Sequence, residues 1–145
     1  IDELELLDVQ GIVPLPGAAE ALAALPVGRS AVVTSCTARL AAVRLGAAAL
    51  AVPQVLVTAD DVTAGKPDPE PFRLGAERLG VDPARCLVVE DAPSGLAAGR
   101  AAGSTTLAVR TTTPTHQLEA DAVVGSLADV VLRVGPDGVR VAQRN

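Results

Sequence analysis

The stretch CLVVEDAPSGLAAGRAAG, residues 86–103, decides the fold. It begins as a short apolar strand and continues, past an acidic pair, into a helical run of small residues. A strand followed directly by a helix is the repeating unit of a parallel α/β sheet. The same couplet occurs in residues 31–48 and 55–80, and a further strand follows at 105–110. The sequence therefore predicts a doubly wound, mostly parallel sheet with helices on both faces.

Further elements are expected on either side of these couplets. The sequence predicts a helix over residues 18–25, a short strand at 122–124 and a peripheral strand at 138–143. The helix of the second couplet is expected to be capped near Asp68 and to stop at Gly80.

Composition limits the class of protein. The chain has 145 residues, of which 49% are apolar, and this predicts one globular domain. A net charge of −5 without a basic run argues against a nucleic-acid partner. The apolar residues 45–57 are interrupted by Gly46 and Pro53, which argues against a membrane span. Cys36 and Cys86 are expected to be unpaired thiols of a cytoplasmic protein.

The first residue, Ile1, stands in a chain without any methionine. We therefore expect an N-terminal piece to precede the chain. No signal peptide is recognisable in its opening residues.

Three polar groups follow successive predicted strands. Ser35 comes after the first, Lys66 lies beyond the second, and Glu90 and Asp91 close the third. Ligands of open parallel sheets bind at the carboxyl ends of the strands, where helix N-termini point N–H groups at anions. We therefore expect Ser35, Lys66 and Asp91 to converge at one edge of the sheet.

Each of these groups also has a purely structural interpretation. Lys66, the only lysine beside eleven arginines, is either a placed point charge or an ordinary surface residue. Asp91 is either a metal ligand or the N-cap of the next helix. Ser35 is either a phosphate ligand or an N-cap, a position that Thr37 could also fill. Lys66 belongs to no Walker motif because Pro67 follows it.

Taken together, the three groups predict phosphoryl-transfer chemistry. Adjacent carboxylates at the end of an apolar strand need a cation, and Mg²⁺ is the usual one. Ser35 and neighbouring amides can hold phosphate oxygens, Lys66 can neutralise developing charge, and Asp91 can hold the metal. A nucleophile is the part that this set lacks.

The segments VVTSCT, GKPDPEPF and CLVVEDAPSGLAAGRAAG resemble motifs two, three and four of the haloacid dehalogenase (HAD) superfamily. The resemblance is to its small sugar-phosphate and glycerol-phosphate phosphatases and covers roughly residues 11–126. It implies a HAD-like core at residues 17–145, with residues 1–16 as the end of a helical cap and its return linker.

The same resemblance implies the role of each site residue. Ser35 and Lys66 are the catalytic residues of this chain. Together with the neighbouring Cys36 they bind phosphate, and Lys66 also stabilises charge. Asp91 is the magnesium ligand, with Glu90 in or near the metal shell. The first motif of the family, DxDGT, carries the nucleophilic aspartate and the acid–base aspartate, and it is absent from the sequence. A preceding segment of the same protein is the expected source of these two aspartates.

The predicted function is a Mg²⁺-dependent phosphatase of a small phosphorylated metabolite, such as a sugar or polyol phosphate. A phosphomutase would use the same residues, and a non-catalytic binding module could keep the site without the chemistry. A dehalogenase would need no metal, which the acidic pair argues against. The family core places its motif-one strand between those bearing Ser35 and Asp91. We therefore expect that slot to be filled by a preceding segment or by another chain, or the sheet to close over it.

Overall fold

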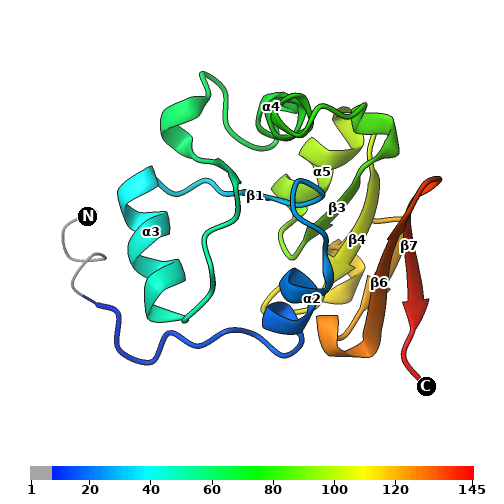
Figure 1. Cartoon of the computed structure of the whole chain (residues 1–145), viewed down its shortest axis with the longest axis horizontal. Coiled ribbons are helices and arrows are strands. Elements are labelled where there is room, and N and C mark those ends of the chain that lie inside the picture. The colour runs from blue at the N-terminus through cyan, green and yellow to red at the C-terminus, as the bar shows by residue number, and fades with distance from the viewer. Residues whose placement is uncertain (1–7) are drawn as a thin grey trace.

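The computed structural model describes residues 8–145, in which strands and helices alternate as far as the fourth strand (Figure 1). The elements, with the labels of Figure 1, are α2 (Ala18–Ala24), β1 (Ala31–Val33), α3 (Ala38–Ala47), β2 (Val55–Val57), α4 (Glu70–Leu79), β3 (Leu87–Glu90), α5 (Pro93–Ala101), β4 (Thr105–Val109), β5 (Ala122–Val124), β6 (Val130–Gly135) and β7 (Gly138–Gln143). Every helix and strand that the sequence predicted is present.

The pairing of the strands confirms the parallel α/β class. Strand β1 pairs in parallel with β2, and β3, β4 and β5 form a second parallel group in that order. Apolar residues on both faces of such strands explain why they read as continuous Val, Leu and Ala runs.

Helices α4 and α5 cover the two parallel groups. Helix α4 packs on β1 and β2, α5 packs on β3 and β4, and the two helices contact each other (Figure 1). Gly75 and Gly99 permit this close packing. A Cβ on Gly75 would lie 3.1 Å from the Val33 side chain, and a Cβ on Gly99 would lie 3.0 Å from the Val88 side chain. The two groups of strands therefore lie under one layer of helices.

The ends of α4 follow the predicted signals. The Asp68 carboxylate accepts a hydrogen bond from the N–H of Glu70 at 2.8 Å, and the helix begins at that residue. Gly80 closes it in the left-handed conformation, with φ 69°.

The C-terminal strands form a hairpin that the sequence reading recognised only in part. Strand β7 is the predicted peripheral strand, but its antiparallel partner β6 was missed. Pro136 and Asp137 make the turn between Gly135 and Gly138, which are paired across it. A Gly-Pro-Asp-Gly turn between two valine-rich runs is a hairpin signal that could have predicted β6.

The division between a cap remnant and a core at residue 16 stays a prediction. Residues 1–7 lie outside the described part of the chain, and residues 8–16 contain turns but neither helix nor strand. Within the described part, no helix has both the length and the apolar character needed to cross a membrane.

Asp61 fastens the end of β2 to α4. Hydrogen bonds from the Arg78 guanidinium at 2.9 Å and from the N–H and hydroxyl of Thr58 at 2.8 Å lower the pKa of Asp61 to about 2 from its ordinary 3.8. A depressed carboxyl pKa stabilises the fold above the unfolded value, and this contribution is lost as the pH falls through the folded value.

We predict that Asp61→Asn flattens the loss of stability between about pH 4 and pH 2, because the substituted side chain no longer takes up a proton on unfolding. Urea unfolding followed by circular dichroism at several pH values measures this slope. Asp137→Asn is the control, because the Asp137 side chain is 86% exposed and its pairing with Arg140 is loose, at 3.7 Å. An unchanged slope in Asp61→Asn would contradict the assignment.

Candidate functional site

Lys66 joins the ends of two strands that are not neighbours in either sheet. Its ammonium donates to the backbone carbonyl of Val33 at 2.9 Å, at the end of β1, and forms an ion pair with the carboxylate of Glu90, at the end of β3. The Lys66 and Glu90 side chains are only 10% and 11% exposed. The interpretation of Lys66 as an ordinary surface residue is therefore wrong.

The Val33 carbonyl belongs to an unpaired strand edge. Backbone groups of successive strand residues point to opposite sides, and the N–H of Thr34 donates to Val57 of β2. Val33 therefore faces away from β2. The N–H of Thr105 in β4 likewise bonds to Cys86, so Leu87 and Val89 of β3 face away from β4.

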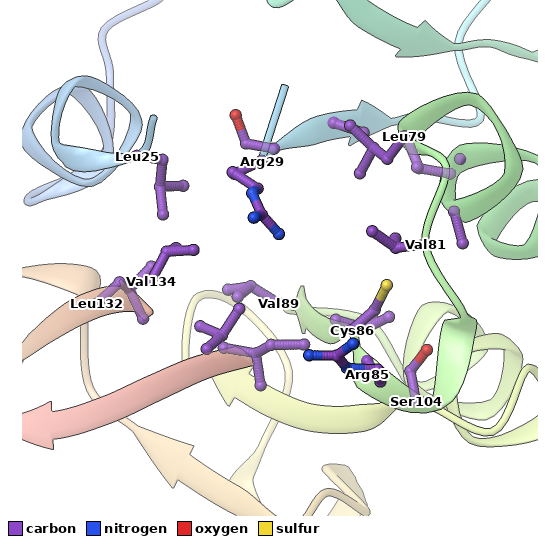
Figure 2. A pocket seen from close by; sticks show the side chains of 18 of the residues that line it. Leu25, Arg29, Leu79, Val81, Arg85, Cys86, Val89, Ser104, Leu132 and Val134 are labelled. Carbon is purple, nitrogen blue, oxygen red and sulfur yellow. The ribbon is translucent and has the colours of Figure 1, made fainter. Parts of the chain in front are cut away.

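The two unpaired edges border a common cavity of about 410 Å³. Strand β1 is hydrogen bonded to β2 alone and β3 to β4 alone among the described strands. Figure 2 shows the apolar side chains around this space, which come from the C-cap of α2 and from α4, β3 and β6: Leu25, Leu79, Val89, Leu132 and Val134. Closure of the sheet between β1 and β3, one of the expected outcomes, is therefore not observed.

The loop that carries Lys66 is closed by its own acidic residues. The Glu70 carboxylate accepts hydrogen bonds from the N–H groups of Thr63 and Ala64 at 2.9 and 2.8 Å. A turn between Gly65 and Asp68 completes the loop, with a hydrogen bond of 3.0 Å. Sequence reasoning assigned no role to Glu70, although its place in GKPDPE was the available signal.

The Glu90 carboxylate lies against the first turn of α5, where only glycine fits. A Cβ on Gly95 would come within 2.1–2.4 Å of the carboxylate atoms of Glu90, far inside van der Waals contact. This contact gives a physical reason for the spacing between Glu90 and Gly95 in the segment CLVVEDAPSGLAAGRAAG. The glycine makes room for the carboxylate that holds Lys66.

Ser35 lies in the bend after β1 and is exposed. Thr37, not Ser35, caps α3, since its side chain accepts a hydrogen bond from the N–H of Leu40 at 3.3 Å. The Thr34 hydroxyl accepts from the N–H of Cys36 at 3.1 Å and shapes the bend. The structure thus removes the capping interpretation of Ser35, while phosphate binding by Ser35 and Cys36 stays a prediction.

Asp91 is exposed and does not cap α5. The N-cap of that helix is Ala92, and no side chain accepts a capping hydrogen bond there. Instead Asp91 accepts a hydrogen bond from the Thr111 hydroxyl at 2.9 Å, from the loop after β4. Sequence reasoning missed Thr111, because twenty positions separate it from Asp91.

The carboxylate oxygens of Asp91 fit a magnesium ion that is bound jointly by the protein, the substrate phosphate and water. Mg²⁺ is usually bound through one or two carboxylates together with substrate phosphate oxygens and waters. The described residues contain no cluster of three or more His, Cys, Asp or Glu side chains that could hold a metal alone. The Glu90 carboxylate is engaged by Lys66, so Asp91 is the carboxylate best placed for such an ion.

Comparisons with known proteins match the chain to a family of hydrolases. A model of the haloacid dehalogenase-like hydrolases matches residues 2–103. Hexitol phosphatase A of Escherichia coli is 39% identical over 99% of the chain, and glycerol-1-phosphate phosphohydrolase 1 of Saccharomyces cerevisiae is 35% identical over 92%. The chain spans 68% of the first relative and 55% of the second.

A solved structure supports the same fold. The putative beta-phosphoglucomutase of Thermotoga maritima superposes with a TM-score of 0.69 at 34% identity. The match covers 79% of this chain and 56% of that one. The described sheets and helices therefore correspond to a part of a longer protein in each of these comparisons.

We predict that Gly95→Ala lowers the free energy of unfolding by about 1–3 kcal/mol, because the new methyl group displaces the Glu90 carboxylate. Gly46→Ala in α3 is the matched control, since nothing lies within 4 Å of a Cβ there. Removing a helical glycine at that open position should stabilise by up to about 1 kcal/mol. Urea unfolding of both variants measures the difference, and equal effects would contradict the close approach of Glu90 to α5.

Proposed function

The chain belongs to the haloacid dehalogenase-like hydrolases, and we propose that, joined to one further strand, it forms a magnesium-dependent phosphatase. The observation that carries this proposal is the position of the Lys66 ammonium, held by Val33 and Glu90 at the end of the gap between β1 and β3. A largely buried ammonium at the ends of β1 and β3 is suited to neutralise the negative charge on the oxygens of a phosphoryl group during its transfer.

The gap between β1 and β3 is the proposed seat of the missing strand. Its two edges carry unpaired backbone groups, which a strand inserted between them would satisfy. The apolar cavity lining supports side chains of such a strand on both faces of the sheet. The resemblance assigns this strand the two aspartates of DxDGT, so its carboxyl end would bring them beside Lys66.

Phosphate would be held by the loops around this point. Ser35 has no capping duty and is exposed after β1, so its hydroxyl is available to phosphate oxygens, with Cys36 beside it in the same bend. Asp91, with its Thr111 partner, would hold Mg²⁺. The ion supplies charge neutralisation and orientation of the phosphate when bound.

The resemblance implies the chemistry of the completed site. A carboxylate oxygen of the first aspartate attacks phosphorus, the ester P–O bond breaks, and the second aspartate gives the leaving alcohol its proton. Water then attacks the phospho-aspartyl group and gives a proton to the second aspartate, the P–O bond to the first aspartate breaks, and phosphate and the free carboxylate are released. Lys66 stabilises the charge on the transferring group in both steps.

The substrate we propose is a small sugar or polyol phosphate. The relatives named for hexitol and glycerol phosphates support this class. The two described cysteines are unpaired, which supports the reducing environment of a cytoplasmic protein. A phosphomutase remains the second candidate because of the Thermotoga maritima neighbour. In that case a sugar hydroxyl rather than water would take the phosphoryl group.

We predict that the 145-residue chain does not hydrolyse an aryl phosphate in Mg²⁺, whereas a version extended upstream through the aspartate-bearing strand does. Release of the aryl alcohol measures both rates. The extended version with its first aspartate replaced by asparagine is the control and should be as inactive as the short chain. Hydrolysis by the short chain as fast as by the active extended one would place the nucleophile within these residues and refute the mechanism.

We predict that Lys66→Arg in the extended enzyme lowers kcat on the order of 10²-fold, because a planar guanidinium cannot replace a compact ammonium between Val33 and Glu90. Steady-state kinetics with the aryl phosphate measures the loss. Arg140→Lys, the reverse exchange at an exposed side chain, is the control and should leave kcat unchanged. Wild-type turnover in Lys66→Arg would remove Lys66 from the proposed mechanism.

A further inference from the structure

We propose that Phe72 is a positioning residue, whose ring holds the Lys66 ammonium in place for catalysis. The ring centroid lies 4.9 Å from Nζ of Lys66. That is within the distance at which the negative face of an aromatic ring attracts a cation. The contact joins the only lysine of the sequence to its only Phe, Tyr or Trp residue.

Helix α4 positions Phe72 beside the Lys66 ammonium. Phe72, Gly75, Ala76 and Leu79 recur at helical spacing and all line the cavity between β1 and β3. Gly75 brings this face of the helix close to Val33, the residue whose carbonyl binds Lys66. Phe72, one turn earlier, therefore lies at the end of β1 where the ammonium is held.

The ring supplies a contact that the other two partners do not. The Val33 carbonyl and the Glu90 carboxylate bind the ammonium through hydrogen bonds, whereas Phe72 presents its aromatic ring to the ammonium. The lysine side chain is 10% exposed, so little water competes for the cation. A cation–π contact is stronger in such a desolvated place than on an open surface. The ring therefore confines the ammonium to the end of the gap.

The composition of the chain allows a direct test by NMR. In a sample with ¹³C-labelled lysine, Lys66 gives the only lysine signals, and Phe72 is the only source of a strong aromatic ring current near it. Protons above a ring face resonate upfield. We expect the Cε protons of native Lys66 to lie upfield of their position in urea, and Phe72→Leu to abolish this shift while Phe72→Tyr keeps it.

Leu79→Val, at the other end of the same apolar face, is the matched control and should keep the shift. The comparison of native with urea-unfolded wild type stands even where Phe72→Leu fails to fold. In the extended protein, the signal absent from Lys66→Arg identifies the same resonance. Native Cε protons at their urea position, or a shift that survives in folded Phe72→Leu, would overturn the contact.

The catalytic consequence rests on the proposed phosphatase function. In the extended enzyme Phe72→Leu should lower kcat roughly 2- to 30-fold, the range expected for a contact of about 0.5–2 kcal/mol at 1.4 kcal/mol per factor of ten. Phe72→Tyr should restore kcat, and KM should change little in both variants. If the wild type shows the ring-current shift but Phe72→Leu keeps its kcat, the positioning role alone is refuted. If the extended wild-type enzyme hydrolyses no aryl phosphate, the proposed function itself is refuted.

Discussion

A buried ammonium constrains the architecture around it. A charge taken out of water is tolerated only where opposite charge and hydrogen bonds replace its hydration. Lys66 obtains these from Glu90 at the end of β3 and from the Val33 carbonyl at the end of β1. Gly95 in turn makes room for the Glu90 carboxylate. Hydrogen bonds from backbone N–H groups to the Glu70 carboxylate close the loop that carries the lysine. Residues from several separate parts of the sequence thus hold or position the Lys66 ammonium.

The same cation marks a break in the sheet. The Val33 carbonyl that binds Lys66 lies on the edge of β1 that pairs with no described strand. The facing edge of β3 is also unpaired among the described strands. An apolar cavity separates them. Unpaired backbone beside apolar walls is suited to receive a strand, because that strand gains hydrogen bonds and burial together. This incomplete sheet and the charge at its edge are the physical basis of the proposed phosphatase.

Local capping explains which polar groups remain available for a ligand. Thr37 caps α3 and Ala92 occupies the N-cap of α5, so neither Ser35 nor Asp91 is committed to holding a helix end. Asp91 is instead oriented by Thr111, which lies beyond a different strand. The candidate site therefore draws on four loops at one end of the parallel strands, as open α/β sheets commonly do.

The sequence by itself determined the helices, every strand except β6, and the end of the sheet where polar groups follow the strands, because apolar periodicity and glycine stops act over a few neighbouring residues. It left Lys66 as either a placed charge or a surface residue, and the structure decided for the placed charge. Only the tertiary structure decided what Lys66 contacts, since Val33 and Glu90 lie 33 and 24 positions away. The Thr111 contact of Asp91 was hidden for the same reason. Such pairings depend on how strands and helices pack, and no local pattern records that packing.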